Sequence, residues 1–140
     1  MLRVTRFVVP LLDAGIPLGP LWLLETRGRK TGVVRVVPVA VARSGSRRWL
    51  VSVFGEVGWV RNIRASGEAR LRRGRQAEEV HVTEVTDGHR AVVAMQLRRS
   101  FWMIPFVRAA FTATPHDGLQ AFEAEAGRHP VFAVMSRPPS

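Results

Sequence analysis

The segment LWLLETRGRKTGVVRVVPVAVAR, residues 21–43, decides the fold of this chain. An apolar run over residues 21–26 is followed by a glycine-containing connection and then by a valine-rich run over residues 33–43. Alternate positions of the second run are apolar on both faces, as in a buried strand or a strand of a barrel. We therefore expect two strands joined by a turn, with Pro38 near a bulge or a sheet edge.

The connection between these strands carries an unusual concentration of positive charge. Residues 26–35 hold four cationic side chains and two glycines, namely Arg27, Gly28, Arg29, Lys30, Gly32 and Arg35. Glycine tolerates backbone angles that let N–H groups approach a ligand closely, and Arg and Lys supply charge for phosphate or carboxylate. Taken alone, the cluster is more simply a solvated turn, so its meaning depends on what lies near it.

A second cluster, GEVGWVRNIRASG, occupies residues 55–67, one strand further along the chain. Its spacing predicts a helix over residues 59–66 that ends at Gly67, with Trp59, Asn62, Ile63 and Ser66 on one face. The two clusters flank a predicted hairpin, formed by residues 33–43 and 49–54 around a turn at 44–46, whose folding can bring them into one groove.

The remaining pattern is rich in strands. We expect strands at 69–73 and 76–86 around a turn at Gly74, a helix from Asp87 to about 99, a short helix from Asp117 to 126 and a last strand at 131–135. Residues 4–14 could form a helix, and residues 101–111 follow no clear pattern. The result is a mainly β fold with peripheral helices, a small closed or split β-barrel of about six antiparallel strands in meander order. We expect a single domain over residues 1–140, with residues 1–20 as an apolar N-terminal arm.

Composition limits the classes of function. The chain has 140 residues, a hydrophobic content of 46% and a formal net charge of +10, and it contains no cysteine. The charge implies an acidic partner, which could be nucleic acid, an anionic membrane surface or a phosphorylated or carboxylated small molecule. The basic residues are not interleaved with aromatic ones as in nucleic-acid-binding modules, so we expect no nucleic-acid partner. The absence of cysteine excludes disulfides, thiolate metal sites and cysteine nucleophiles.

Residues 7–24 are mostly apolar, but three prolines and Asp13 argue against a membrane-spanning helix. We expect a cytoplasmic protein, and the apolar stretch leaves open a peripheral contact with the inner face of the membrane.

No protein-borne catalytic machinery is apparent. The segment around Gly28 lacks the second glycine of a nucleotide-binding Walker loop, and no G-x-S-x-G motif occurs. The four histidines show no ligand spacing, so no metal site is expected, and Glu123 and Glu125 are most simply solvated. No catalytic residue can be assigned. If the protein is an enzyme, we expect a bound cofactor to carry the chemistry.

The linked motifs T-x-G-R-K-T-G-x-x-R-x-x-P, LVSVFG and G-x-x-x-W-V-R-N-I-R-A-S-G resemble those of the deazaflavin-dependent nitroreductase family. Members of this family are split β-barrel oxidoreductases that use reduced coenzyme F420. The resemblance continues through residues 70–85 and into 119–132, and so covers most of the chain. It implies an F420-dependent reductase that passes hydride to an unsaturated small molecule such as a quinone, an enone or a nitro compound. A lipid-binding or membrane-associated member of the fold, taking a fatty acid without redox turnover, is the alternative.

The resemblance also implies a set of cofactor-binding residues. It places the cofactor phosphate near Arg29, Lys30 and Arg35, at the turn of Thr31 and Gly32, with Arg61 and Arg64 adding complementary charge. It places Ser52, Val53, Phe54, Gly55, Trp59 and Asn62 along the cofactor, and Val37 and Pro38 near its ring. The chain departs from the branch that reduces nitroimidazole drugs, because its loop between Gly55 and Trp59 is shorter and it has no tyrosine. Phe101, Trp102 or Phe106 could line the substrate pocket instead. The substrate and the oligomeric state, monomer or homodimer, stay open.

Overall fold

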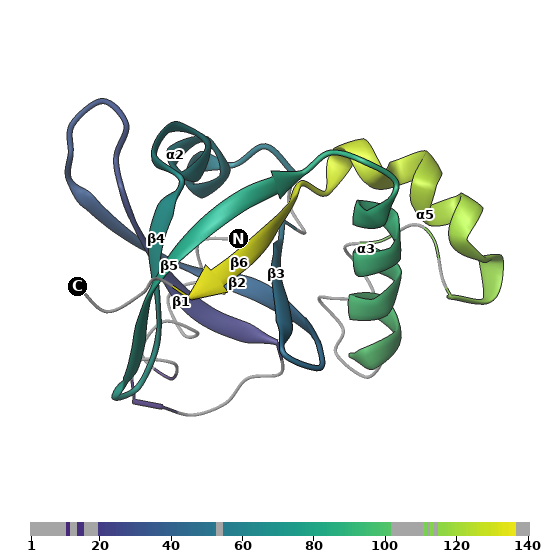
Figure 1. Cartoon of the computed structure of the whole chain (residues 1–140), viewed down its shortest axis with the longest axis horizontal. Coiled ribbons are helices and arrows are strands. Elements are labelled where there is room, and N and C mark those ends of the chain that lie inside the picture. Colours follow the sequence, from purple (N-terminus) through teal and green to yellow (C-terminus); the bar gives the residue numbers. More distant parts are fainter. Residues whose placement is uncertain are drawn as a thin grey trace.

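The strands form a closed antiparallel barrel, flanked by helices (Figure 1). The computed structural model describes residues 20–52, 55–101 and 115–136, together with residues 11, 14, 15, 111 and 113. The strands are β1 (Leu21–Arg27), β2 (Val34–Ser44), β3 (Arg47–Val51), β4 (Glu68–Arg73), β5 (Gln76–Val85) and β6 (Val131–Ser136). The helices are α2 (Gly58–Ser66), α3 (His89–Ser100) and α5 (Leu119–Glu125), with short 3-10 turns η1 (Pro115–Asp117) and η2 (Ala126–Arg128). The predicted mainly β barrel is confirmed.

The strand order corrects one expectation. Around the barrel the order is β1-β2-β3-β6-β5-β4, with β4 pairing back to β1, so the strands do not form a simple meander. The chain leaves β3, passes through α2 and enters the sheet again beside β1, and the last strand fills the gap between β3 and β5. The pairings of β4 with β1 and of β6 with β3 and β5 join strands that are distant in the sequence, so no turn motif could have predicted them.

The antiparallel register gives the barrel two distinct ends. We call the end that holds Arg27, Val34, Val51 and Val131 the hairpin end, because the β1–β2 connection lies there. The opposite end, with Leu21, Ser44, Arg73, Gln76 and Ser136, is called the far end. Residues at the two ends of one strand are therefore separated by the length of the barrel.

The core has two parts. Apolar side chains from all sides fill the barrel, including Leu24, Val39, Leu50, Leu71 and Phe132. A second cluster, which includes Trp49, Val93, Leu97 and Phe122, lies between the barrel wall and helices α3 and α5. Each fully buried side chain of this size contributes about 1.5–3 kcal/mol. The apolar stretch at 7–24 is thus partly explained, because Leu23 and Leu24 belong to β1 and are fully buried.

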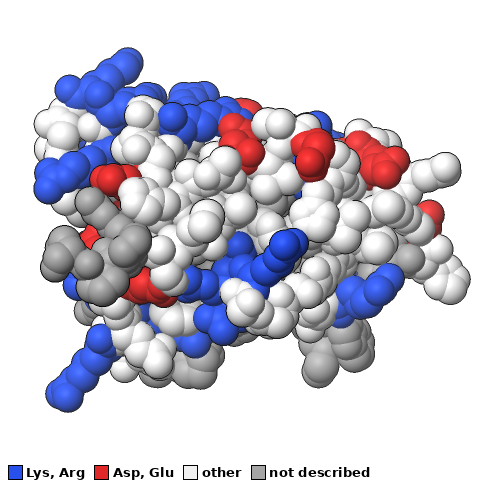
Figure 2. Space-filling view, in the orientation of Figure 1, with Lys and Arg blue, Asp and Glu red and all other residues white. Residues whose placement is uncertain are grey.

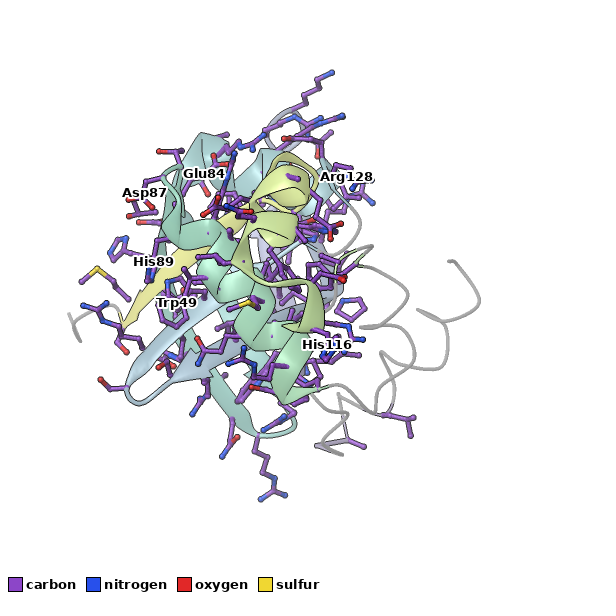
Figure 3. All side chains as sticks on the ribbon, turned by 90° about the vertical axis from the view of Figure 1, so that its right-hand side faces the viewer. Trp49, Glu84, Asp87, His89, His116 and Arg128 are labelled. Atoms are coloured by element: carbon purple, nitrogen blue, oxygen red, sulfur yellow. The ribbon has the colours of Figure 1, made fainter. Side chains whose placement is uncertain are left out.

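Helices α3 and α5 pack on one side of the barrel, where Figure 3 looks directly at them. Asp87 was predicted to cap α3, but the N-cap residue is Gly88. The Asp87 carboxylate lies one residue earlier and accepts a hydrogen bond of 2.9 Å from the backbone N–H of His89, the first residue of the helix. The His89 ring in turn lies 5.8 Å from that of Trp49 on β3 (Figure 3). The sequence therefore placed this helix correctly.

Helix α2 closes the hairpin end of the barrel. Gly67 ends it in a left-handed conformation with φ of 71°, as the sequence predicted. Its buried residues are Val60, Asn62 and Ile63. Of the four residues predicted to share one face, Asn62 and Ile63 are buried, Trp59 is half-buried and Ser66 is exposed. Val60 and Ile63, three residues apart, point into the barrel core.

We expect Gly74→Ala to destabilise the protein more than Gly45→Ala. Both glycines sit in turns with positive φ, where a side chain costs about 1–2 kcal/mol. A Cβ on Gly74 would lie only 2.7 Å from the Cα of Gly15, whereas one on Gly45 would meet nothing within 4 Å. Urea unfolding of the two variants measures the difference, and equal losses would contradict the close packing of Gly15 on Gly74.

Some expectations lie mostly outside the described residues. These are the helix at 4–14, the arm at 1–20 and the segment 101–111. The assignment of a single domain stays a prediction. In the part of the chain that the structure describes, no helix is both long and apolar enough to cross a membrane.

Candidate functional site

The β1–β2 connection is a compact turn held by its own hydrogen bonds. The Gly28 N–H donates to the Val33 carbonyl and the Gly32 N–H to the Gly28 carbonyl, both at 2.8 Å. The Thr31 hydroxyl accepts from the Val33 N–H at 3.2 Å. Gly32 has a φ of 71°, which favours glycine. Thr31 and Gly32 thus shape the turn, and Thr31 has a structural task there.

Asn62 ties this turn to α2. Its side-chain oxygen accepts from the Arg29 backbone N–H at 3.4 Å and from the Arg29 guanidinium at 3.0 Å. Its amide group donates to the Thr26 hydroxyl at 3.1 Å, and both Asn62 and Thr26 are buried. The structure therefore brings the two sequence clusters together, as predicted, and shows Asn62 as the residue that joins them. Thr26 belongs to the same network, although sequence reasoning gave it no role.

Lys30, Arg35 and Arg61 are exposed at this end, and within the described residues none of them forms an ion pair. Arg35 lies directly across from buried Thr26 in the β1–β2 register, so both side chains leave the sheet on the same face. In Figure 2, Lys and Arg gather over the β1–β2 hairpin and α2, at the upper left of the view. These three cations are available to an anionic ligand.

Arg64 differs from these cations. Its guanidinium binds Glu84 at 2.7 Å and also binds Glu56. Hydrogen bonds to Glu84 and then to Glu56 hold the pKa of Arg64 above its usual value, and the bond from Arg64 holds the pKa of Glu56 below its usual value. Arg64 was predicted to supply charge to the cofactor. The structure shows its charge already balanced by two carboxylates.

Val37 and Pro38 both lie on β2, but successive residues of a strand point to opposite faces. Val37 packs against the barrel core, across from Leu24, whereas Pro38 lies across from Leu23 on the other face. The two residues therefore cannot meet a ligand ring from the same side. Pairing of β2 with β3 begins only at Ala40. Pro38 therefore lies on a stretch of β2 that pairs with β1 alone, which agrees with the predicted position at a sheet edge.

Ser52 and Gly55 form a second turn, just beyond the hairpin end of β3. Ser52 is buried, and its hydroxyl donates to the Gly55 carbonyl at 2.5 Å. Its backbone N–H donates to the Pro130 carbonyl at 2.8 Å, which fixes the turn against the start of β6. Val53 and Phe54, predicted beside them, lie outside the described residues.

A buried pair behind this turn corrects the interpretation of Glu125 as solvated. Glu125 and His129 are each 4% exposed, and His129 Nε2 lies 3.3 Å from a Glu125 carboxylate oxygen. The other carboxylate oxygen accepts from the Ala113 N–H at 2.7 Å. His129 Nδ1 lies 3.1 Å from the Ser52 carbonyl, and because a carbonyl can only accept, Nδ1 is the donor of that hydrogen bond.

This pair therefore positions the Ser52–Gly55 turn from behind. The Phe111 ring covers it, with its centroid 4.4 Å from that of His129. The only sequence signal was the spacing of four residues between Glu125 and His129, which puts both on one side of a helical turn.

Trp59 is half-buried on α2, and its ring lies 5.9 Å from that of Phe132 in the barrel core. It anchors the helix and leaves part of its surface at the hairpin end. Phe101 does not join this group, because it lines a groove at the far end, and Trp102 and Phe106 lie outside the described residues. In the described part of the chain, no group of three acidic, histidine or cysteine side chains could hold a metal ion.

Comparison with known families decides what kind of protein carries this arrangement. The model of the F420H2-dependent quinone reductase family matches residues 5–114. The chain belongs to this family. The expected kinship with F420-dependent reductases is thereby confirmed. No curated protein matches the chain.

Solved structures share the fold at low sequence identity. A structure of an F420-H2 dependent reductase, FDR-A, is 18% identical, with a TM-score of 0.56, and the match covers 83% of this chain and 94% of that one. A domain-swapped dimer is 17% identical, with a TM-score of 0.58 and coverage of 93% and 95%. The haem storage protein HutZ from Vibrio cholerae is 10% identical, with a TM-score of 0.60 and coverage of 86% and 84%. At these identities the likeness establishes the barrel fold alone.

Proposed function

We propose that this protein is an F420H2-dependent reductase that binds the deazaflavin cofactor at the hairpin end of its barrel. The observation that carries the proposal is the set of three exposed cations, Lys30, Arg35 and Arg61, none of which forms an ion pair with a described residue, although Glu56 acts on Arg61 at longer range. They lie beside the β1–β2 turn, which Asn62 of α2 holds in place through hydrogen bonds to Arg29 and Thr26. Membership of the F420H2-dependent quinone reductase family supports the choice of cofactor.

The donor set fits the cofactor chemically. Coenzyme F420 carries a phosphate and a tail of glutamates, and Lys and Arg without partners bind both groups through charge-assisted hydrogen bonds. Arg29 would contribute less, because its guanidinium is already bonded to Asn62. When bound, the reduced cofactor supplies a hydride, and we propose a quinone, an enone or a nitro compound as its acceptor.

The residues of this chain would bind and orient rather than react. The Ser52–Gly55 turn, held from behind by His129, and the exposed part of Trp59 would fix the position of the ring. Such positioning contributes to rate because the reacting groups no longer have to find one another in solution. We expect the proton that completes the reduction to come from solvent.

Titration of the purified protein with coenzyme F420, FMN and haem, followed by fluorescence and absorbance, tests the choice of cofactor. We expect tight binding of F420 and oxidation of its reduced form when menadione is added. Haem belongs in the comparison because HutZ shares the fold. Affinity for haem or FMN together with none for F420 would overturn the proposal.

Cofactor binding should weaken as salt rises. Lys30, Arg35 and Arg61 are exposed, and at about 0.15 M salt the Debye length is only about 8 Å, so added ions screen their attraction for phosphate and carboxylates. The dissociation constant measured over a series of sodium chloride concentrations should therefore rise steadily. A constant value would mean that ring contacts alone provide the affinity.

A further inference from the structure

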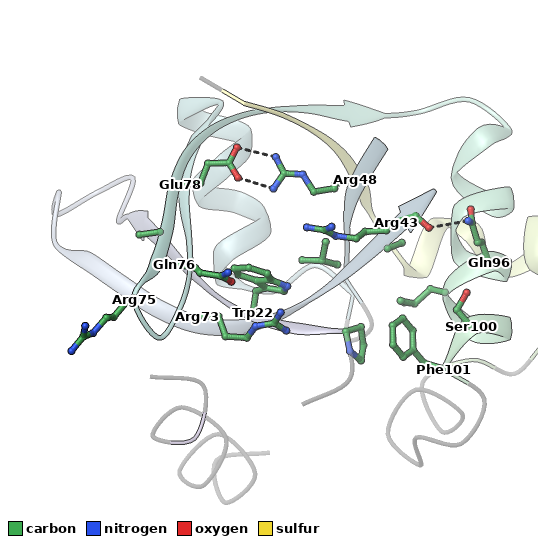
Figure 4. A pocket seen from close by; sticks show the side chains of 15 residues that line it. Trp22, Arg43, Arg48, Arg73, Arg75, Gln76, Glu78, Gln96, Ser100 and Phe101 are labelled. Atoms are coloured by element: carbon green, nitrogen blue, oxygen red, sulfur yellow. Dashed lines mark hydrogen bonds and ion pairs between the residues drawn. The ribbon is translucent and has the colours of Figure 1, made fainter. Parts of the chain in front are cut away.

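The far end of the barrel contains an open groove of about 860 Å³, within the range of small-molecule sites. It is lined by residues from β1, from the facing ends of β2 and β3, from the β4–β5 hairpin and from the end of α3 (Figure 4). The register places it at the opposite end of the barrel from Lys30 and Arg35. The proposed cofactor site therefore does not account for it.

The groove lies between α3 and the barrel, and each side combines apolar and polar side chains. Ser100 at the end of α3 and Phe101 directly after it stand on one side, and Trp22 and Gln76 lie across from them on the barrel (Figure 4). Leu97 also lines the groove. A hydrogen bond of 3.0 Å from the Gln96 side chain to the Arg43 carbonyl joins the two sides. The groove is thus formed where α3 packs against the barrel, and this hydrogen bond holds its two sides together.

Two arginines give the groove positive charge that the lining does not neutralise. The Arg73 guanidinium lies 4.1 Å from the centre of the Trp22 ring, which fixes both side chains. Arg43 extends into the hollow (Figure 4), and neither arginine forms an ion pair with a described residue. Arg75 also lines the groove but points away from its centre (Figure 4).

The carboxylate in the described lining, Glu78, forms its ion pair with Arg48, and it acts on Arg43 only at longer range. Glu78 is held by Arg48 through two hydrogen bonds of 2.8 and 3.0 Å, and it also accepts one from Ser136. These bonds, that of Arg48 first, hold the pKa of Glu78 below its usual value. The Arg48–Glu78 pair is therefore neutral as a unit, and the surplus charge belongs to Arg43, Arg73 and Arg75.

We propose that this groove is a second binding site, which takes an organic anion with a flat apolar body. Trp22 and Phe101 receive the body, and Arg43 binds the anionic head. The Ser100 hydroxyl and the Gln76 amide lie in the same lining and supply further hydrogen bonds. An aromatic carboxylate, sulfonate or phosphate has this chemistry. A neutral ring of the same size would leave the guanidinium of Arg43 without an anionic partner.

The experiment compares two fluorescent probes that differ in one charged group, anilinonaphthalene sulfonate and uncharged phenylnaphthylamine. The parent protein should bind the sulfonate more tightly. Arg43→Gln should raise the dissociation constant of the sulfonate about tenfold and leave that of the neutral probe unchanged. Trp22→Leu should weaken the binding of both probes. Equal affinity of the parent for the two probes would overturn the proposal.

Matched variants exclude general attraction by a basic protein. Arg47→Gln removes the same charge at the same end of the barrel, from an exposed residue outside the groove, and should leave sulfonate binding unchanged. Lys30→Ala, at the hairpin end, should also have no effect. An equal loss in Arg43→Gln and Arg47→Gln, or a loss in Lys30→Ala alone, would show that the probe binds elsewhere. The binding of the two probes is measured without coenzyme F420, so this test remains valid even if the protein does not bind that cofactor.

Discussion

Replacing both Lys30 and Arg35 by alanine should raise the dissociation constant for coenzyme F420 about a hundredfold or more. A charge-assisted hydrogen bond to a phosphate contributes about 1.5–3 kcal/mol, so each single variant should lose roughly ten- to a hundredfold. Lys30 lies within the turn and Arg35 just inside β2, so the two can reach one phosphate from opposite sides of the hairpin. Fluorescence titration of the two single variants and the double variant measures the effect.

The stability of the cofactor-free protein should barely change in these variants. Lys30 and Arg35 are exposed and form no ion pair with the described residues, and such charges contribute little to folding.

Arg64→Gln is the matched control for cofactor affinity, because it removes a charge from the same end but from a side chain already bound by Glu56 and Glu84. It should leave cofactor affinity nearly unchanged. If Lys30→Ala and Arg35→Ala bind F420 as the parent does, this turn does not hold the phosphate.

Glu125→Ala should lower the free energy of unfolding by about 2–6 kcal/mol. The change removes the acceptor of the buried Ala113 N–H and the partner of His129 Nε2, and an unpaired buried polar group costs about 1–3 kcal/mol. Because His129 also holds the Ser52 carbonyl, the variant should in addition bind F420 more weakly. Urea unfolding measures the first effect and fluorescence titration the second.

Glu123→Ala provides the control on the same helix. Glu123 is exposed, so its loss should change stability by less than about 0.5 kcal/mol. Glu125→Gln keeps an oxygen that can accept from the Ala113 N–H and should lose less stability than Glu125→Ala. Similar unfolding curves for Glu123→Ala and Glu125→Ala would mean that the buried pair contributes nothing measurable.

The two predictions act on different properties of the same end of the barrel. Loss of Lys30 and Arg35 removes contacts with the ligand and leaves the fold as it is. Loss of Glu125 weakens the support behind the Ser52–Gly55 turn and acts on the fold first. A stability measurement beside each titration therefore separates ligand contact from positioning.

Local features of the sequence determined the elements of this protein. The predicted strand at 76–86 and the helix from Asp87 to about 99 agree within two residues with β5 and α3. The apolar alternation, the glycine turns and the helix end at Gly67 depend on neighbours within a few residues, which the sequence displays directly. The motif pair at 26–38 and 55–67 likewise led to the correct family.

Only the tertiary structure decided which charges are free. Arg64 and Lys30 look alike in the sequence, but Glu84, which binds Arg64, lies twenty residues later on β5. Glu123 and Glu125 also look alike, and the packing of α5 buries one of them and exposes the other. The strand order and the far-end groove likewise depend on β1, β5 and α3 meeting across long stretches of chain. The sequence alone thus determined elements and family, while burial and pairing between distant residues came from the fold, because those interactions act through space rather than along the chain.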